Sequence, residues 1–102
     1  MTLKPGARLR GVADSTEVVV VKAPSGDVDL RCGGYPMVAI GEDAGDAQPL
    51  DPDFAGGTQL GKRYVDDASG IELLCTKPGD GSLSVAAEIL LIKEAKPLPS
   101  SD

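Results

Sequence analysis

Residues 17–22 read Glu17-Val18-Val19-Val20-Val21-Lys22, and this stretch decides the fold class of the chain. Four consecutive β-branched residues favour an extended backbone, because their restricted side-chain torsions suit a pleated strand. Successive residues of a strand point to opposite faces, so this strand carries large apolar side chains on both faces. An antiparallel sheet with one wet face needs only one apolar face, so the second apolar face requires a cover.

Further short strands are expected after this stretch, separated by turns that contain glycine or proline. The chain has 13 glycines and 8 prolines, which punctuate it at the rhythm of an all-β protein. Strands are expected at 28–30, 37–40, 59–65, 71–76 and 82–85, and turns at 24–27, 66–70 and 78–81. The pattern predicts an all-β fold, a small sandwich or barrel of about seven to eight short antiparallel strands.

The length of 102 residues fits a single β domain over residues 1–102. We expect a first half at about 6–40 and a second half at about 59–95. Residues 41–58 are acidic and rich in glycine and proline, which indicates a surface loop between the halves. Residues 96–102 are expected to form an extended tail.

The two halves resemble each other when they are aligned on Glu17 and Glu72, an offset of 72 − 17 = 55 residues. Each half then reads as an apolar strand, a lysine, a glycine-containing turn and an alternating strand. The aligned pairs are Val18 with Leu73, Val19 with Leu74, Lys22 with Lys77, Gly26 with Gly81, Val28 with Leu83 and Leu30 with Val85. The pattern predicts two similar hairpin halves related by a pseudo-two-fold axis. Two unrelated hairpins of similar length would give the same pattern.

The segment 85–96 supports two interpretations. It is rich in strong helix formers, so intrinsic propensity favours a helix. Four consecutive apolar residues, Ile89-Leu90-Leu91-Ile92, fit no helical stripe, and the repeat aligns the segment with a part of the first half that contains Gly33-Gly34 and Pro36. We therefore predict a strand.

Charge and composition exclude several classes of partner. Ten basic and 16 acidic residues give a net charge of −6, which disfavours nucleic acid. The longest apolar runs are far short of the roughly 20 residues that span a bilayer, so no membrane partner is expected. The N-terminus lacks the apolar region of a signal peptide, and we expect a cytoplasmic protein.

The chain contains no residue set that suggests catalysis, a cofactor or a metal. Histidine is absent, which removes the commonest general base and metal ligand. Residues 56–63 approach a phosphate-binding P-loop, but Arg63 stands where the hydroxyl should be and a strand is expected to follow. Acidic pairs such as Asp51 with Asp53 do not match a calcium loop, so we interpret them as turn-forming residues. We predict that the protein is not an enzyme and has no cofactor.

Cys32 and Cys75 are the only cysteines. Neither has a cysteine or histidine at metal-binding spacing, and a cytoplasmic compartment disfavours a disulfide. Cys75 follows Leu73-Leu74 and is expected to be a small core residue, whereas Cys32 next to Gly33-Gly34 is the better candidate for an exposed thiol.

The apolar runs 18–21 and 89–92 are the feature that survives these exclusions. A 102-residue chain without a convincing helix has little with which to cover their second faces, so a second subunit is the natural cover. We predict a non-enzymatic, self-associating structural or accessory protein that forms a homo-oligomer. The expected interface residues are Val18, Val20, Ile89, Leu90, Leu91 and Ile92.

Two other functions stay open. The smooth apolar segment Ala86–Ile92 would suit the interface of an engineered subunit in a designed assembly such as a cage, whose partner would be a second protein chain, designed or natural. The second open function is a small-ligand binding module with a pocket between the two halves. The ending Lys93-Glu94-Ala95-Lys96-Pro97-Leu98-Pro99 resembles that of small uncharacterised β-rich actinobacterial proteins. That resemblance covers few residues and implies no function.

Overall fold

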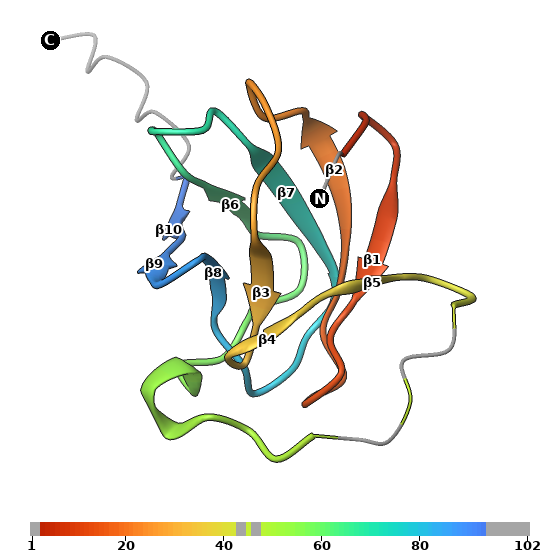
Figure 1. Cartoon of the computed structure of the whole chain (residues 1–102), viewed down its shortest axis with the longest axis vertical. Coiled ribbons are helices and arrows are strands. Elements are labelled where there is room, and N and C mark those ends of the chain that lie inside the picture. Colours follow the sequence, from red (N-terminus) through yellow and green to blue (C-terminus); the bar gives the residue numbers. More distant parts are fainter. Residues whose placement is uncertain (1–2, 43–44, 46–47, 94–102) are drawn as a thin grey trace, which may run out of the picture.

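The fold is a sandwich of two antiparallel sheets in a computed structural model that describes residues 3–42, 45 and 48–93 (Figure 1). This confirms the all-β prediction. The strands are β1 (Arg8–Arg10), β2 (Glu17–Lys22), β3 (Leu30–Cys32), β4 (Tyr35–Pro36), β5 (Val38–Ala39), β6 (Arg63–Val65), β7 (Glu72–Lys77), β8 (Leu83–Val85), β9 (Glu88–Ile89) and β10 (Leu91–Ile92). They outnumber the expected strands because the chain breaks into short pieces where it crosses between the sheets.

The strand orders show the internal repeat directly. The six-stranded sheet runs β10-β6-β7-β2-β1-β5 and the four-stranded sheet runs β4-β3-β8-β9. Exchanging each strand of the first half (β1 to β5) for its counterpart in the second (β6 to β10) reproduces both orders, read in reverse. The centre of one sheet pairs Val19 with Leu74, and the centre of the other pairs Arg31 with Ser84. The two similar halves predicted from the sequence are therefore related by a pseudo-two-fold axis through both sheets.

Hydrogen bonds across this axis come in reciprocal pairs. The Gly33 amide donates to the Ser82 carbonyl at 3.0 Å, and the Ala86 amide donates to the Asp29 carbonyl at 2.8 Å. The offset between Gly33 and Ala86, and between Asp29 and Ser82, is 86 − 33 = 82 − 29 = 53 residues. Each half therefore donates the equivalent backbone hydrogen bond to the other half.

The sequence alignment was wrong for the third strand of each half. Arg8 and Arg63 open equivalent strands at an offset of 63 − 8 = 55, but Leu30 and Leu83 open theirs at 83 − 30 = 53. The pairs Val28 with Leu83 and Leu30 with Val85 are therefore not equivalent. The physical reason is the connection before that strand, which spans residues 23–29 in the first half and 78–82 in the second.

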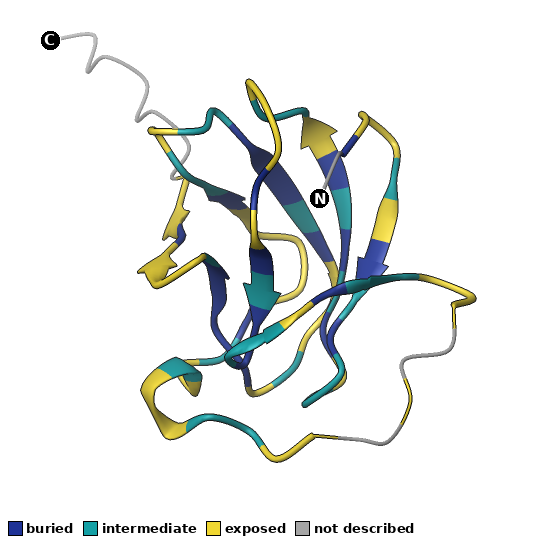
Figure 2. Cartoon of the chain, in the orientation of Figure 1, coloured by how far each residue is buried: buried dark blue, intermediate teal, exposed yellow. Residues whose placement is uncertain are grey.

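The core lies between the sheets and draws on both halves (Figure 2). Its buried residues are Leu3, Leu9, Val18, Val20, Val28, Leu30, Cys32, Met37, Tyr64, Ile71, Leu73, Cys75, Leu83 and Leu90. In β2 the side chains alternate, so that Val18 and Val20 point inward while Val19 and Val21 are on the outer face and partly exposed. Aliphatic side chains dominate this core, as the shortage of aromatic residues requires.

The segment 85–93 is extended, as predicted, and the helical interpretation is wrong over this described range. It leaves β8 through a tight turn at Ala86, whose φ is 52°. It then crosses from the four-stranded to the six-stranded sheet, with Leu90 buried at the crossing. The Leu90 amide donates to the Leu83 carbonyl at 2.9 Å, and its counterpart Met37 donates to the Leu30 carbonyl at 3.0 Å.

The connection between the halves, over its described residues 41–42, 45 and 48–58, lies mostly at the surface. It contains the 3-10 helix η1 (Pro52–Phe54), which Asp51 caps by accepting a hydrogen bond from the Asp53 amide. Thr58 at its end is buried. The tail 96–102 lies outside the described residues, and none of the described segments is a helix long and apolar enough to cross a membrane.

Candidate functional site

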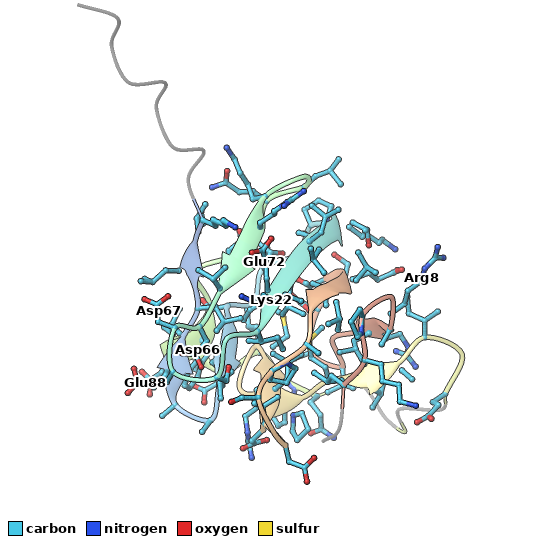
Figure 3. All side chains as sticks on the ribbon, turned by 90° about the horizontal axis from the view of Figure 1, so that it is seen from above. Arg8, Lys22, Asp66, Asp67, Glu72 and Glu88 are labelled. Atoms are coloured by element: carbon cyan, nitrogen blue, oxygen red, sulfur yellow. The ribbon has the colours of Figure 1, made fainter. Side chains whose placement is uncertain are left out.

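Each half ends in an edge where the chain crosses from one sheet to the other. Residues 35–40 form the first edge, through β4, Met37 and β5, and residues 88–93 form the second, through β9, Leu90 and β10. They are equivalent at an offset of 88 − 35 = 53. Arg8, beside the first edge, and Glu88, on the second, lie at opposite sides of the molecule in Figure 3. We call residues 35–40 the N-terminal edge and residues 88–93 the C-terminal edge.

The C-terminal edge exposes large aliphatic side chains. Ile89 is 50% exposed, Leu91 67% and Ile92 39%. Leu90 between them is only 5% exposed, so the structure removes it from the predicted interface. It is buried because the crossing between the sheets turns that one residue into the sandwich. Three of the four residues predicted at this edge are therefore available to a partner.

Val18 and Val20 were also predicted at the interface, and this prediction is wrong for their side chains. They are 0% and 1% exposed, because β2 faces the core with these two residues. The outward residues of the same run are Val19, which is partly buried, and Val21, which is 39% exposed. The run did have two apolar faces, but the sequence did not say which was inside. Pairing of β2 with β7 decides it, since Val20 lies opposite the buried Leu73.

An ion-pair network holds the C-terminal edge to the six-stranded sheet. The Glu72 carboxylate, 8% exposed, accepts from Lys93 Nζ at 3.0 Å and from Arg63 Nη1 at 3.1 Å. The hydrogen bond from Lys93 is the largest cause that lowers the pKa of Glu72 below its usual value, although burial acts in the opposite direction. The edge is therefore anchored by charge as well as by backbone pairing.

A polar cluster at one end of the sandwich belongs to the structure rather than to a site. One Asp14 oxygen, Oδ2, accepts from the Thr16 hydroxyl at 2.6 Å and from the Gly81 amide at 2.7 Å. The buried Thr16 hydroxyl also meets that of Thr58 at 2.9 Å, and the Thr58 hydroxyl accepts from the Gly79 amide at 2.9 Å. These bonds tie three loops together, and the carboxylate is fully engaged in doing so.

Both thiols are buried and free. Burial, followed by the neighbouring Asp14 carboxylate, raises the pKa of Cys32 to about 12. Burial also raises the pKa of Cys75. Cys32 is therefore not the exposed thiol that the sequence suggested, because β3 turns it into the core. Cys75 is a core residue, as predicted.

The near P-loop of residues 56–63 is a loop that enters a strand, as expected from its sequence. It is followed by β6 rather than by a helix. Within the described ranges, no three cysteine, aspartate or glutamate side chains gather as metal ligands would.

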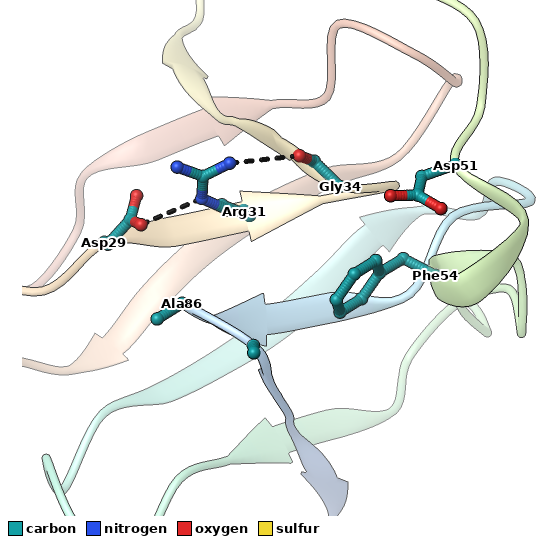
Figure 4. A pocket seen from close by; sticks show the side chains of 7 residues that line it. Asp29, Arg31, Gly34, Asp51, Phe54 and Ala86 are labelled. Atoms are coloured by element: carbon teal, nitrogen blue, oxygen red, sulfur yellow. Dashed lines mark hydrogen bonds and ion pairs between the residues drawn. The ribbon is translucent and has the colours of Figure 1, made fainter.

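A pocket of about 330 Å³ opens on the outer side of the four-stranded sheet (Figure 4). It is lined by Asp29, Arg31, Gly34, Asp51, Phe54, Ala86 and Ala87. These residues come from both halves and from the connection between them. A second, larger and more enclosed hollow of about 580 Å³ lies along the N-terminal edge, beside Leu9 and Met37.

The comparisons with known proteins give no family for this chain. No protein-family model matches it, and no match was found to a curated protein or to a solved structure. The functional argument therefore depends on the geometry above.

Proposed function

We propose that the protein is a non-enzymatic structural or accessory protein that associates with copies of itself through the C-terminal edge. The observation that carries the proposal is the exposure of Ile89, Leu91 and Ile92 on consecutive edge strands. Contiguous exposed apolar side chains are one mark of an interaction surface. The groups that could do chemistry are engaged elsewhere, since both thiols are buried and Asp14 holds loops together.

The backbone of the edge supports the same proposal. β10 pairs with β6 on one side, and no described strand lies on its other side. An edge strand of this kind can add a further strand through main-chain hydrogen bonds. A two-fold copy is a self-complementary partner, because its own β10 can pair antiparallel with the first. The six-stranded sheet would then continue across the dimer, with Leu91 and Ile92 covered.

The charge distribution suits antiparallel pairing of this segment. Glu88 begins the edge and Lys93 ends it, with apolar residues between. A two-fold arrangement brings the acidic end of one copy toward the basic end of the other. Opposite charges across strands stabilise pairing by roughly 0.2–1 kcal/mol, and they set the register more than the affinity.

An engineered subunit of a larger assembly is a second candidate, supported by the same exposed residues. The segment Ala86–Ile92 contributes its aliphatic side chains to one edge, and a different protein chain could occupy that edge instead of a second copy. The mass of the purified chain separates the two. A dimer or other small oligomer supports the first candidate, and a very large closed particle supports the second.

Leu91→Arg tests the proposal, with size-exclusion chromatography and light scattering as the measurement. We expect a multiple of the 10.4 kDa chain mass for the unmodified protein and the monomer mass for the variant. Leu60→Arg is the matched control, because Leu60 is 64% exposed but lies in the turn before β6 and is not part of the edge. Equal loss of association in both variants would show that general surface charge, rather than the edge, controls the mass.

A further inference from the structure

The pocket on the outer side of the four-stranded sheet lies close to the pseudo-two-fold axis. Arg31 is one of its lining residues, and Arg31 opposite Ser84 is the central pair of that sheet. Gly34 and Ala87 line it from equivalent turns of the two halves, at an offset of 87 − 34 = 53. The connection breaks the symmetry, because it brings Asp51 and Phe54 over one side only (Figure 4).

The single cation of the pocket is already engaged. Arg31 Nε donates to Asp29 Oδ2 at 2.8 Å, and its Nη1 donates to the Gly34 carbonyl at 3.1 Å. Asp51 Oδ1 accepts from the Asp53 amide at 2.9 Å, whereas Asp51 Oδ2 accepts no hydrogen bond from the described residues. Two carboxylates and one guanidinium leave the lining with an excess of one negative charge. The net negative charge of the lining therefore favours a positively charged group in the pocket.

The remaining lining is apolar, and the close-up shows the Phe54 ring across the pocket from Arg31 (Figure 4). Ala86 and Ala87 contribute only small methyl side chains to the adjoining part of the lining. The fully buried Ser84 hydroxyl, on the same face as Arg31 by its pairing, has no hydrogen-bond partner in the described structure. A buried hydroxyl without a partner is unfavourable, so this face of the sheet carries an unsatisfied polar group.

We propose that this pocket binds an organic cation, an alkylammonium or guanidinium group on a short apolar stem. Asp51 Oδ2 would accept its hydrogen bonds, and a charge-assisted bond of this kind is stronger than a neutral one. The face of Phe54 attracts a cation, and the alanine methyl groups would contact the stem. The volume of about 330 Å³ is more than enough to admit a group of this size. The site adjoins the C-terminal edge at Ala87 but contains none of the edge residues 88–93, so either proposal can fail alone.

The test is a titration of the ¹⁵N-labelled full chain with n-butylammonium, followed by amide chemical shifts. Butyrate is the matched control, since it has a four-carbon chain but carries the opposite charge. We expect saturable shifts at Gly34, Asp51, Ala86 and Ala87 with butylammonium and none with butyrate. N-acetyl-lysine methylamide presents the same cation as a peptide side chain. Tighter binding of one of the two cations identifies a free amine or a peptide as the source.

Asp51→Asn is the decisive variant, because asparagine still caps η1 but lacks the charge. We expect at least about a fivefold rise in the dissociation constant for butylammonium, as a charge-assisted bond becomes a neutral one. Asp53→Asn is the control on the same helix, and it should bind as the unmodified chain does. The proposal is overturned by an absence of saturable shifts, by equal shifts with butyrate, or by equal weakening in the two variants.

Discussion

The two edges of the sandwich share one backbone design and differ in the side chains that they expose. Met37 and Leu90 are buried at equivalent crossings, and each donates the same backbone hydrogen bond. On the N-terminal edge, Pro36 removes a backbone donor. Its counterpart on the C-terminal edge is Ile89, which is 50% exposed. The repeat therefore dictates where the edges lie, and a few substitutions distinguish the backbone donors and side chains that the two edges expose.

The buried crossings should dominate stability in both halves. We expect Leu90→Ala to reduce the free energy of unfolding by about 2–5 kcal/mol, and Met37→Ala to have a similar effect, because each leaves a cavity in the core. Urea unfolding measures both. Leu91→Ala is the control, since Leu91 is 67% exposed, and it should change stability by less than about 0.5 kcal/mol. A loss at Leu91 as large as that at Leu90 would contradict the assigned burial.

Transplanting the proline tests the difference between the edges. Ile89→Pro copies Pro36 at the equivalent backbone position, so we expect the sandwich to accept it. The substitution removes both the backbone N–H donor of residue 89 and the exposed isoleucine side chain. The expected result is a shift of the mass toward the 10.4 kDa monomer, with far-ultraviolet circular dichroism unchanged. A folded variant that keeps the mass of the unmodified protein would remove β9 from the proposed interface.

Glu72 and its counterpart Glu17 differ in the strength of their ion pairs, and Glu72 should make the stability of the fold depend on pH. The pKa of Glu72 is lowered in the folded chain, chiefly by Lys93, so its carboxylate contributes stability above the unfolded pKa. That contribution is lost as pH falls below about 4.5, the ordinary value, and through the lower folded pKa. Glu17 has one longer contact, 3.7 Å to Lys77, and is 33% exposed.

Acid titration of unfolding free energies checks this contrast. We expect Glu72→Gln to reduce the free energy of unfolding at neutral pH by about 1–3 kcal/mol. The substitution removes the negative charge that accepts hydrogen bonds from Arg63 and Lys93. The variant should also flatten the pH dependence below 4.5. Glu17→Gln is the matched control, with an expected change within about 1 kcal/mol, as is usual for an exposed pair. An unchanged acid limb in Glu72→Gln would contradict the lowered pKa.

The smallest expected effect concerns the turns of the two halves. Ala86 has a φ of 52°, in the left-handed region that disfavours a side chain, and its counterpart is Gly33 at 65°. Ala86→Gly should therefore stabilise the fold by up to about 1 kcal/mol. The reverse change, Gly33→Ala, should destabilise it, because the new Cβ would lie 2.7 Å from Leu50 Cδ1. Thermal unfolding of the two variants measures both effects: a higher midpoint temperature is expected for Ala86→Gly and a lower one for Gly33→Ala.

The sequence predicted the features that follow from local pattern. The β-branched run 17–22, the turns and the repeat gave an all-β sandwich of two halves. The offset failed after β2, because a two-residue difference in one connection does not interrupt the apolar pattern. Pattern also could not decide which face of the run was buried, nor that Leu90 turns inward where the chain changes sheets. Those facts depend on strand pairing, which no local signal in a single sequence specifies.

The pocket was anticipated only in its general place, between the halves. Its lining joins Asp29 and Arg31 to Asp51 and Phe54, which are about twenty residues further along the chain. Gly34 permits this contact, since a Cβ there would lie 2.6 Å from that of Asp51. A glycine in a turn carries no information about which loop will pack against it, so the sequence could not identify the site.

The mass of the unmodified 102-residue chain in solution, measured by sedimentation equilibrium across micromolar concentrations, tests the central claim most directly. The exposed C-terminal edge predicts a mass that is a whole multiple of 10.4 kDa and falls toward the monomer on dilution. A mass of 10.4 kDa throughout that range would contradict self-association, and the exposed residues of the edge would then need another explanation.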